Sequence, residues 1–219
     1  MIDNEKPKVV IIDYNLGNLF SVKQACDIVG INSKISSNKL DIEEADALIL
    51  PGVGAFIEAM NNLEKLDLVN PIKAAVKKGK PFFGICLGLQ LVFTKSEEFG
   101  SGNGLDLIPG IIKKFPTEFE TKKIKVPQIA WNKIYSYKQS WNNTPLFNIS
   151  ENEFMYFVHS YYVSPSSEDC IVAKTNYEGL EYCSAISKGN IFATQFHPEK
   201  SAEKGINIYK NWAKNNKLI

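Results

Sequence analysis

The chain has 219 residues, of which 44% are hydrophobic and 22% charged, which is the balance of an ordinary globular protein. Its net charge is +1, and every one of its 25 basic residues is a lysine. This charge does not favour a protein that binds nucleic acid or membrane surfaces. The sequence also lacks arginine, whose guanidinium group binds phosphate and guanine through paired hydrogen bonds. The longest uncharged apolar stretch, residues 81–94, is too short to span a bilayer. Residues 1–8 lack a signal-peptide core, and the four cysteines form no C-x-x-C motif, so we expect a cytoplasmic protein.

Strands and helices alternate through the first hundred residues. The β-branched run Lys8-Val-Val-Ile-Ile-Asp13 is typical of a strand buried on both faces, and a helix capped by Asn18 and ended by Gly30 follows it. Further strands are expected at residues 31–35, 47–50 and 81–85, and further helices at residues 56–66, 68–78 and 87–95. This alternation predicts an α/β fold with a mostly parallel central sheet flanked by helices.

A different pattern begins after Gly100. Short strands separated by polar turns are expected at residues 110–115, 133–137, 154–158, 170–174, 182–187 and 190–195. A helix at residues 203–214 closes the chain. The second half therefore adds a smaller mixed or antiparallel β region. Because no repeat or linker divides the sequence, we expect one domain over residues 1–219.

The sequence Gly84-Ile85-Cys86-Leu87-Gly88 follows a buried strand and opens a helix. This is the pattern of a nucleophile elbow, with cysteine in place of serine. The sharp turn would lift Cys86 out of the sheet, and the helix N-terminus would stabilise its thiolate. The backbone N–H of Leu87 would face a developing oxyanion. The alternative is that Cys86 is a small buried hydrophobic residue.

A base for that cysteine is available near the end of the chain. One of only two histidines, His197, lies in the segment Gln195-Phe196-His197-Pro198-Glu199. Residues i and i+2 of an extended segment point the same way, so Glu199 could orient the His197 imidazole and stabilise its cation. The alternative is a structural histidine.

The segment Leu50-Pro51-Gly52-Val53-Gly54 ends a predicted parallel strand, at the edge where open α/β sheets place their sites. Its two glycines allow the peptide planes to reorient. The amides of Val53 and Gly54 could then supply a second oxyanion donor. A plain turn is the alternative.

These motifs resemble those of class I glutamine amidotransferase domains. The likeness rests on Gly84-Ile-Cys-Leu-Gly-Leu-Gln90 and on Gln195-Phe-His-Pro-Glu-Lys-Ser201. A narrower resemblance, to the glutaminase subunits of imidazole glycerol phosphate synthase, rests on four more segments. They are Asp13-Tyr14 with Gly17-Asn18-Leu19, residues 50–56 with Met60, residues 104–110, and Tyr156-Phe-Val-His-Ser-Tyr161. Together the segments follow the family's order over nearly the whole chain, which implies the single-domain fold of that family.

The resemblance implies hydrolysis of glutamine to glutamate and ammonia, with no cofactor and no metal. Cys86 would attack the side-chain amide and form a thioester, His197 would protonate the leaving ammonia and then activate water, and Glu199 would orient His197. The resemblance also implies a set of residues that bind glutamine: Gly52, Gln90, Glu98, Ser160 and Tyr161. His159 could be a second base, but the family motif makes it a structural neighbour of the glutamine pocket.

The resemblance further implies that ammonia passes through a channel to a separate (β/α)₈-barrel synthase subunit in a heterodimer. That subunit would make imidazole glycerol phosphate and AICAR in histidine biosynthesis. Residues that match family positions at the interface are Asn18, Trp131, Asn132, Tyr156 and Lys200. Two departures lie on this rim. Asn15 stands where the family usually has a second glycine, and Gln128-Ile129-Ala130 stands where it usually has His-Met-Gly.

These departures leave open which synthase is served. The alternative is a paralogous glutaminase that supplies ammonia for amidination of a nucleotide-sugar or surface-polysaccharide precursor. A cysteine protease or other hydrolase is disfavoured because no histidine lies between Cys86 and His159. A non-catalytic binding module is disfavoured because Cys86, His197 and Glu199 are all intact.

Overall fold

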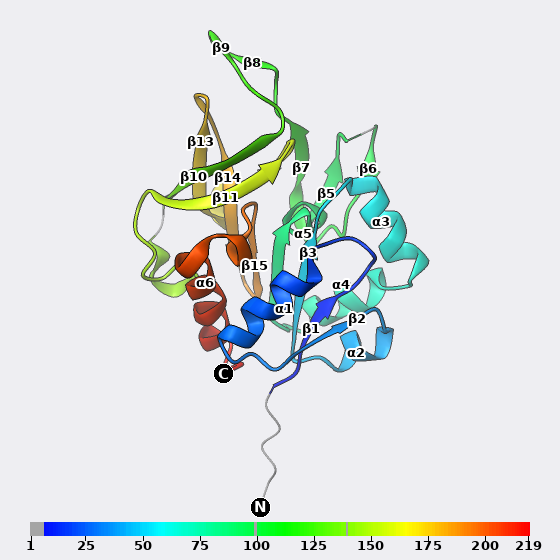
Figure 1. Cartoon of the computed structure of the whole chain (residues 1–219). Helices are drawn as coiled ribbons and strands as arrows, with labels where there is room; N and C mark the ends of the chain where they lie inside the picture. The colour runs from blue at the N-terminus through cyan, green and yellow to red at the C-terminus, as the bar shows by residue number, and fades with distance from the viewer. Residues whose placement is uncertain (1–6, 99, 139) are drawn as a thin grey trace, which may run out of the picture.

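The computed structural model describes residues 7–98, 100–138 and 140–219 (Figure 1). Five parallel strands, in the spatial order β2-β1-β3-β4-β15, form one half of the main sheet. The sequence predicted four of them as parallel strands, but it placed the strand at residues 190–195 in the mixed or antiparallel region, whereas β15 pairs in parallel with β4. They are β1 (Val9–Ile12), β2 (Ser33–Ser36), β3 (Ala47–Gly52), β4 (Phe82–Cys86) and β15 (Ile191–Thr194). Most of the segment on which the signal-peptide expectation rests, residues 1–6, lies outside the described residues.

Helices pack on both faces of these strands, because successive strand residues point to opposite faces and both sets are apolar. Val9 and Ile11 belong to one hydrophobic cluster, and Val10 and Ile12 belong to the other. The first cluster is completed by α1 (Leu19–Ile28) and α6 (Ala202–Asn215). The second is completed by α2 (Lys39–Glu44), α3 (Phe56–Lys65), α4 (Val69–Lys77) and α5 (Leu87–Leu91).

The other half of the sheet is mixed and mainly antiparallel, which confirms the expected change of pattern. From β15 it continues through β14 (Leu180–Lys188), β12 (Tyr161–Pro165), β7 (Ile108–Lys114), β5 (Phe93–Ser96) and β6 (Gly102–Asn103). A branch from β14 runs through β13 (Ile171–Tyr177), β10 (Gln128–Ser136) and β11 (Glu153–His159). A separate hairpin joins β8 (Glu118–Phe119) and β9 (Lys122–Lys123). The 3-10 turns are Trp141–Asn143, Glu168–Cys170 and Pro198–Lys200.

The structure corrects one predicted helix. The helix expected at residues 87–95 ends at Leu91, and β5 begins at Phe93 and pairs with β7. Val92, Phe93 and Thr94 are β-branched or aromatic, so sheet pairing overrides the helical spacing of the apolar residues. The short elements α2, β5, β6, β8, β9 and β12 were not anticipated.

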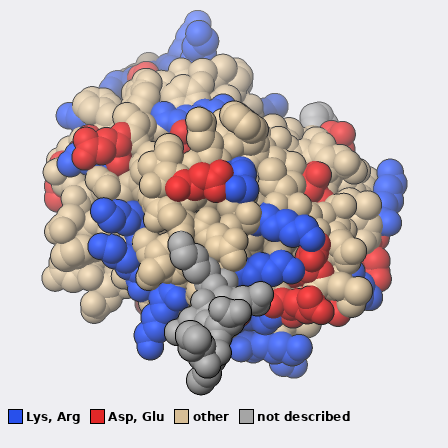
Figure 2. All heavy atoms as spheres, turned by 60° about the horizontal axis from the view of Figure 1, so that its bottom comes forward, with Lys and Arg blue, Asp and Glu red and all other residues tan. Residues whose placement is uncertain are grey.

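Lysine and acidic side chains are interspersed over the face shown in Figure 2, as the near-zero net charge suggests. In the described part of the chain, no helix is long and apolar enough to cross a membrane. The carboxyl ends of β3 and β4 lie side by side, since Gly52 pairs with Cys86. This is the edge at which the candidate site is built.

Candidate active site

Cys86 is the last residue of β4 and the N-cap of α5, so it stands on a sharp strand-to-helix turn. Its backbone has φ 55° and ψ −103°, a left-handed φ that a non-glycine residue rarely adopts. Gly88 allows α5 to approach β3 closely, because a Cβ on Gly88 would lie 1.8 Å from the Leu50 carbonyl oxygen. Leu87 is the first residue of α5, where backbone N–H groups lack partners within a helix. The elbow pattern of the sequence is therefore present as a local structure.

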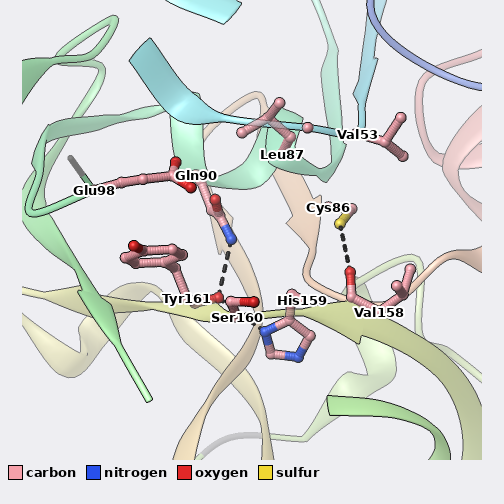
Figure 3. A pocket seen from close by; sticks show the side chains of 10 residues that line it. Val53, Cys86, Leu87, Gln90, Glu98, Val158, His159, Ser160 and Tyr161 are labelled. Carbon is pink, nitrogen blue, oxygen red and sulfur yellow. Dashed lines mark hydrogen bonds between the residues drawn. The ribbon is translucent and has the colours of Figure 1, made fainter. Parts of the chain in front are cut away.

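A cavity of about 180 Å³ opens beside Cys86 (Figure 3). It lies between the elbow and the β11–β12 segment, with the loop after β3 on one side. Its lining residues are Val53, Gly54, Cys86, Leu87, Gln90, Glu98, Val158, His159, Ser160 and Tyr161. The structure thus brings together most of the residues singled out in the sequence for glutamine and oxyanion binding. Gly52, His197 and Glu199 are not in the lining.

The sulfur of Cys86 contacts two groups that the sequence analysis did not assign. The thiol donates to the Val158 carbonyl oxygen at 3.8 Å, and Gln195 Nε2 donates to the sulfur at 3.7 Å. Gln195 directly follows β15, and its position in the motif with His197 was the available signal. Cys86 is 5% exposed and is one of the residues that line the cavity.

His197 and Glu199 form a buried pair behind the cysteine. His197 Nδ1 lies 2.7 Å from Glu199 Oε1, and the two side chains are 3% and 1% exposed. Ser201 Oγ donates to the His197 carbonyl oxygen at 2.7 Å, which fixes the turn between them. Burial would lower the pKa of His197, but the Cys86 and Glu199 charges raise it to about 10. The expected side-by-side placement of His197 and Glu199 is confirmed.

Gln90 and Glu98 supply the polar groups on the other side of the cavity. Gln90 Nε2 donates to the Tyr161 carbonyl oxygen at 3.0 Å and to Gln195 Oε1 at 3.2 Å, so its amide can offer a ligand only its carbonyl oxygen. Glu98 Oε2 accepts the backbone N–H of Phe56 at 2.6 Å. Burial raises the pKa of Glu98, and this hydrogen bond opposes the rise.

The loop after β3 is anchored at one end by Tyr14, a residue to which the sequence analysis gave no role. The Tyr14 hydroxyl donates to the Pro51 carbonyl oxygen at 2.8 Å. A Cβ on Gly52 would lie 2.0 Å from that hydroxyl oxygen, so the close approach requires glycine. Gly52 is consequently a packing position, whereas Val53, 38% exposed, and Gly54 face the cavity.

His159, the second histidine, is buried in the wall of the cavity. Its Nδ1 lies 2.8 Å from the Tyr161 carbonyl oxygen, and its Nε2 lies 3.3 Å from the Tyr182 hydroxyl. Burial lowers the pKa of His159 to about 4, although the hydrogen bond to the Tyr161 carbonyl opposes this. A neutral imidazole with both nitrogens engaged suits a structural neighbour of the pocket better than a second base.

The residues expected at a partner interface divide into two groups. Trp131, Tyr156 and Lys200 lie together beside the His197 segment, with ring centroids 6.0 Å apart for Trp131 and Tyr156 and the lysine Nζ 5.8 Å from the Tyr156 ring. Asn18 caps α1 by accepting the Ser21 backbone N–H. Asn132 donates to the Asn176 carbonyl oxygen, which ties β10 to the end of β13. These two asparagines therefore have local structural roles.

The outer face of β10 and β11 is apolar and exposed around Trp131 and Tyr156. Ile129 is 61% exposed, and Trp131 and Phe154 are each 49% exposed. The antiparallel register places Ile129 opposite Val158 and Trp131 opposite Tyr156. Since Val158 also lines the cavity, this face extends from the cavity rim.

No group of three or more histidine, cysteine or acidic side chains within the described ranges is arranged to hold a metal ion. The four cysteines are free thiols, and Cys26, Cys170 and Cys183 are buried like Cys86. The groups that the structure places at the site are the Cys86 sulfur, the His197–Glu199 pair and the amides around the cavity.

Comparison with known proteins gives a consistent result. The sequence profile of the family "Glutamine amidotransferase class-I" matches residues 10–215. The "Imidazole glycerol phosphate synthase subunit HisH" of Syntrophotalea carbinolica is 44% identical over 207 residues, which cover 93% of this chain and 98% of that protein. The protein of the same name from Aquifex aeolicus is 45% identical over 206 residues, which cover 94% and 95%.

Solved structures of low identity share the fold. PurLQS from Thermotoga maritima superimposes with a TM-score of 0.71 at 17% identity, and the match covers 96% of this chain and 99% of that chain. The glutaminase domain of CTPS from Trypanosoma brucei superimposes with a TM-score of 0.63 at 16% identity, and the match covers 95% of this chain and 94% of that chain.

Proposed function

Because the chain belongs to the class-I glutamine amidotransferase family, we propose that it hydrolyses L-glutamine to glutamate and ammonia with Cys86 as nucleophile, His197 as acid and base, and Glu199 as the residue that orients His197. The observation that carries this proposal is the placement of Cys86 on a strained elbow, at the wall of a cavity, where it interacts electrostatically with His197 of a buried His197–Glu199 pair. Within the family, the relatives named as subunits of imidazole glycerol phosphate synthase support a role in histidine biosynthesis.

The reaction proceeds in two halves. The Cys86 thiol first gives its proton to His197, and the resulting thiolate attacks the carboxamide carbon of glutamine. The carbonyl electron pair moves to the oxygen, which the backbone amides of Leu87, Val53 and Gly54 stabilise. The C–N bond then breaks as His197 gives its proton to the departing ammonia, and a thioester remains. His197 next takes a proton from water, the hydroxide attacks the thioester, and glutamate leaves as the sulfur is released.

The cavity groups suit glutamine. The Gln90 carbonyl oxygen can accept from the substrate amide, since both N–H groups of the Gln90 amide are already engaged. The Glu98 carboxylate is the acidic side chain of the lining and pairs with the substrate ammonium. Ser160 and Tyr161 close the opposite wall, where Figure 3 shows them across from Glu98.

We further propose that the ammonia passes to a (β/α)₈-barrel synthase subunit that docks over the β10–β11 face in a heterodimer. The exposed Ile129, Trp131 and Phe154 side chains support this surface, because they form an apolar area next to the cavity rim. In the isolated chain, the loop at Val53 and Gly54 can turn a carbonyl toward the oxyanion position. Loss of one oxyanion donor lowers the rate about 10²–10³-fold. A partner that favours the loop conformation with the N–H toward the oxyanion therefore restores this rate and switches the glutaminase on.

Glutamate release by the wild type and by Cys86→Ala, each alone and with a histidine-pathway barrel subunit and its acceptor, tests both proposals. Cys86→Ala is expected to abolish glutamate release, whereas Cys26→Ala, a change at another buried thiol, leaves it intact. The Cys86→Ala complex still uses added ammonia, because ammonia bypasses the thioester.

Normal glutamate release by Cys86→Ala would remove Cys86 from the mechanism. Full activity of the chain alone would refute the switch. Activation by a sugar-amidating barrel, and not by the histidine-pathway barrel, would replace the proposed pathway with the amidination of a nucleotide-sugar or surface-polysaccharide precursor.

A further inference from the structure

A buried series of hydrogen-bonding side chains leads from β10 to the glutamine cavity. Gln128, the first residue of β10, is fully buried and lies 2.9 Å from the Tyr182 hydroxyl through its Oε1. That hydroxyl lies 3.3 Å from His159 Nε2, and His159 Nδ1 lies 2.8 Å from the Tyr161 carbonyl oxygen. The same carbonyl accepts from Gln90, whose amide also reaches Gln195 beside the Cys86 sulfur.

The protons available on His159 and Tyr182 determine which group donates in each of these hydrogen bonds. A carbonyl oxygen can only accept, so His159 Nδ1 carries a proton and donates it to Tyr161. The pKa of His159 is lowered to about 4, chiefly because the ring is buried, and His197 faces it as a second cationic group. The ring is therefore neutral and its Nε2 is an acceptor. Tyr182 must then donate its single proton to His159.

With its proton on His159, the Tyr182 oxygen is left to accept hydrogen bonds, and the two side chains that interact with it are Gln128 and Thr175. With Oε1 toward Tyr182, the buried Gln128 Nε2 has no hydrogen-bond partner. A half-turn of the amide exchanges the two atoms and points an N–H at the Tyr182 oxygen. It also replaces an unpaired buried N–H by an unpaired carbonyl oxygen, which is the less unfavourable of the two.

We propose that Gln128, Tyr182 and His159 are positioning residues that form a one-way hydrogen-bond chain, from the Gln128 amide N–H to the Tyr182 oxygen, from the Tyr182 O–H to His159 Nε2, and from His159 Nδ1–H to the Tyr161 carbonyl. The chain holds Tyr161 where its carbonyl orients Gln90, so it sets the glutamine-binding wall. This inference rests on the proposed glutaminase function for its effect on catalysis, but the tautomer of His159 does not depend on activity.

The series of hydrogen bonds begins on β10, the strand that carries the surface proposed for the partner. Gln128 points inward from β10, whereas its neighbour Ile129 and, two residues on, Trp131 are exposed on the face proposed for the partner. Gln128 stands at a point where the sequence departs from the usual family motif. The partner-facing strand and the glutamine-binding wall are therefore joined by side chains as well as by the β10–β11 pairing of Gln128 with His159.

The test uses ¹⁵N-histidine NMR of the full chain, together with KM and kcat for glutamine in the complex with the barrel subunit. Only two histidines contribute signals, and His159→Asn assigns them. The wild type is expected to show a neutral His159 with its proton on Nδ1 and a hydrogen-bonded, unprotonated Nε2 at pH 7. Tyr182→Phe is expected to shift the Nε2 signal and to raise KM about 2- to 10-fold, the effect of one lost hydrogen bond, with little change in kcat.

Two substitutions of Gln128 distinguish the direction of the hydrogen bonds from the packing of the side chain. Gln128→Glu in its ionised form presents only acceptors, so Tyr182 donates to the new carboxylate and His159 gains a proton on Nε2, visible as two protonated nitrogens at a pH above the pKa of the new carboxyl. Gln128→Met, similar in shape but without a donor, leaves the Tyr182 to His159 bond and the tautomer unchanged. Tyr162→Phe serves as the control. Tyr162 lies near Tyr182 but takes no part in the proposed series of hydrogen bonds, so this substitution is expected to leave KM unchanged.

A wild-type His159 that is protonated on Nε2 at pH 7 would overturn the chain, as would a Tyr182→Phe variant with an unshifted Nε2 signal. Because the NMR spectrum of the wild type is decisive, poor folding of a variant does not leave the inference undecided. Absence of glutamate release from the wild-type complex would refute the proposed function instead, and the two failures are distinguishable.

Discussion

Gly88 lies where helix α5, whose N-cap is Cys86, packs closely against strand β3. A Cβ at this position would lie 1.8 Å from the Leu50 carbonyl oxygen and 2.9 Å from its carbonyl carbon, both of them backbone atoms in the middle of the sheet. The former distance falls 1.6 Å short of the 3.4 Å at which ordinary contacts begin. In Gly88→Ala, α5 must therefore move away from β3 by about that amount, and Cys86 moves with it.

The displacement predicts a large catalytic effect and a moderate effect on stability. A misplacement of about 1 Å at a reacting group costs on the order of 10²-fold in rate, so we expect kcat for glutamate release to fall at least 10²-fold. Overpacking costs about 1–3 kcal/mol of unfolding free energy, and the better helix propensity of alanine offsets about 1 kcal/mol of this. Urea unfolding and steady-state glutamate release in the partner complex measure the two effects separately.

Leu63→Ala is the matched control, because Leu63 is fully buried in α3 and lies outside the cavity lining. Its truncation costs about 2–5 kcal/mol of unfolding free energy but leaves the elbow in place, so kcat is expected to stay close to wild type while the protein is folded. If Gly88→Ala kept a wild-type kcat, the close approach of α5 to β3 would not position the nucleophile, and the reasoning would be refuted.

Two further predictions concern the titrating groups. Glu199→Gln removes the charge that helps raise the pKa of His197, so we expect kcat to fall about 10²–10⁴-fold. Glu199→Asp keeps the charge and is expected to retain more activity. Equal kcat values for Glu199→Gln and the wild type would contradict this. The pKa of His159 is about 4 in the folded chain against 6.5 ordinarily, so the unfolded chain binds a proton that the folded chain does not, and stability falls as pH drops through this window. We expect His159 to account for a loss of about 3 kcal/mol of unfolding free energy between pH 7 and pH 4, measured as the difference in pH dependence between the wild type and His159→Gln; parallel curves would argue against a buried neutral histidine.

The parts of the site that the sequence could predict are those set by local geometry. The elbow at Cys86 follows from glycines around a strand-to-helix turn, and the His197–Glu199 contact follows from the two-residue repeat of an extended segment. The Asn18 cap follows from the preference of asparagine for that position, and the structure confirms it. Each of these depends on residues only a few positions apart.

Contacts between distant segments could not be predicted in this way. Tyr14 reaches the Pro51 carbonyl, and Gln128 reaches Tyr182, across 37 and 54 residues. Strand β5 escaped detection because its residues also fit a continuing helix, and only its pairing with β7 decides between the two. The strand at β15 was expected from its apolar residues, but its parallel pairing beside β4 depends on the whole sheet.

The position of β15 has a consequence for the order in which the protein becomes active during translation. The strand that covers the edge of β4 and leads to Gln195 and His197 is translated after the Cys86 strand, and Cys86 and Gln195 are 109 residues apart. Until then β4 has an open edge on that side, and the Cys86 thiol has neither the Gln195 amide nor the His197–Glu199 pair beside it. A nascent chain therefore carries Cys86 without these partners until β15 is made. Under the proposed mechanism, glutamine hydrolysis begins only when β15 and the segment after it have closed the sheet.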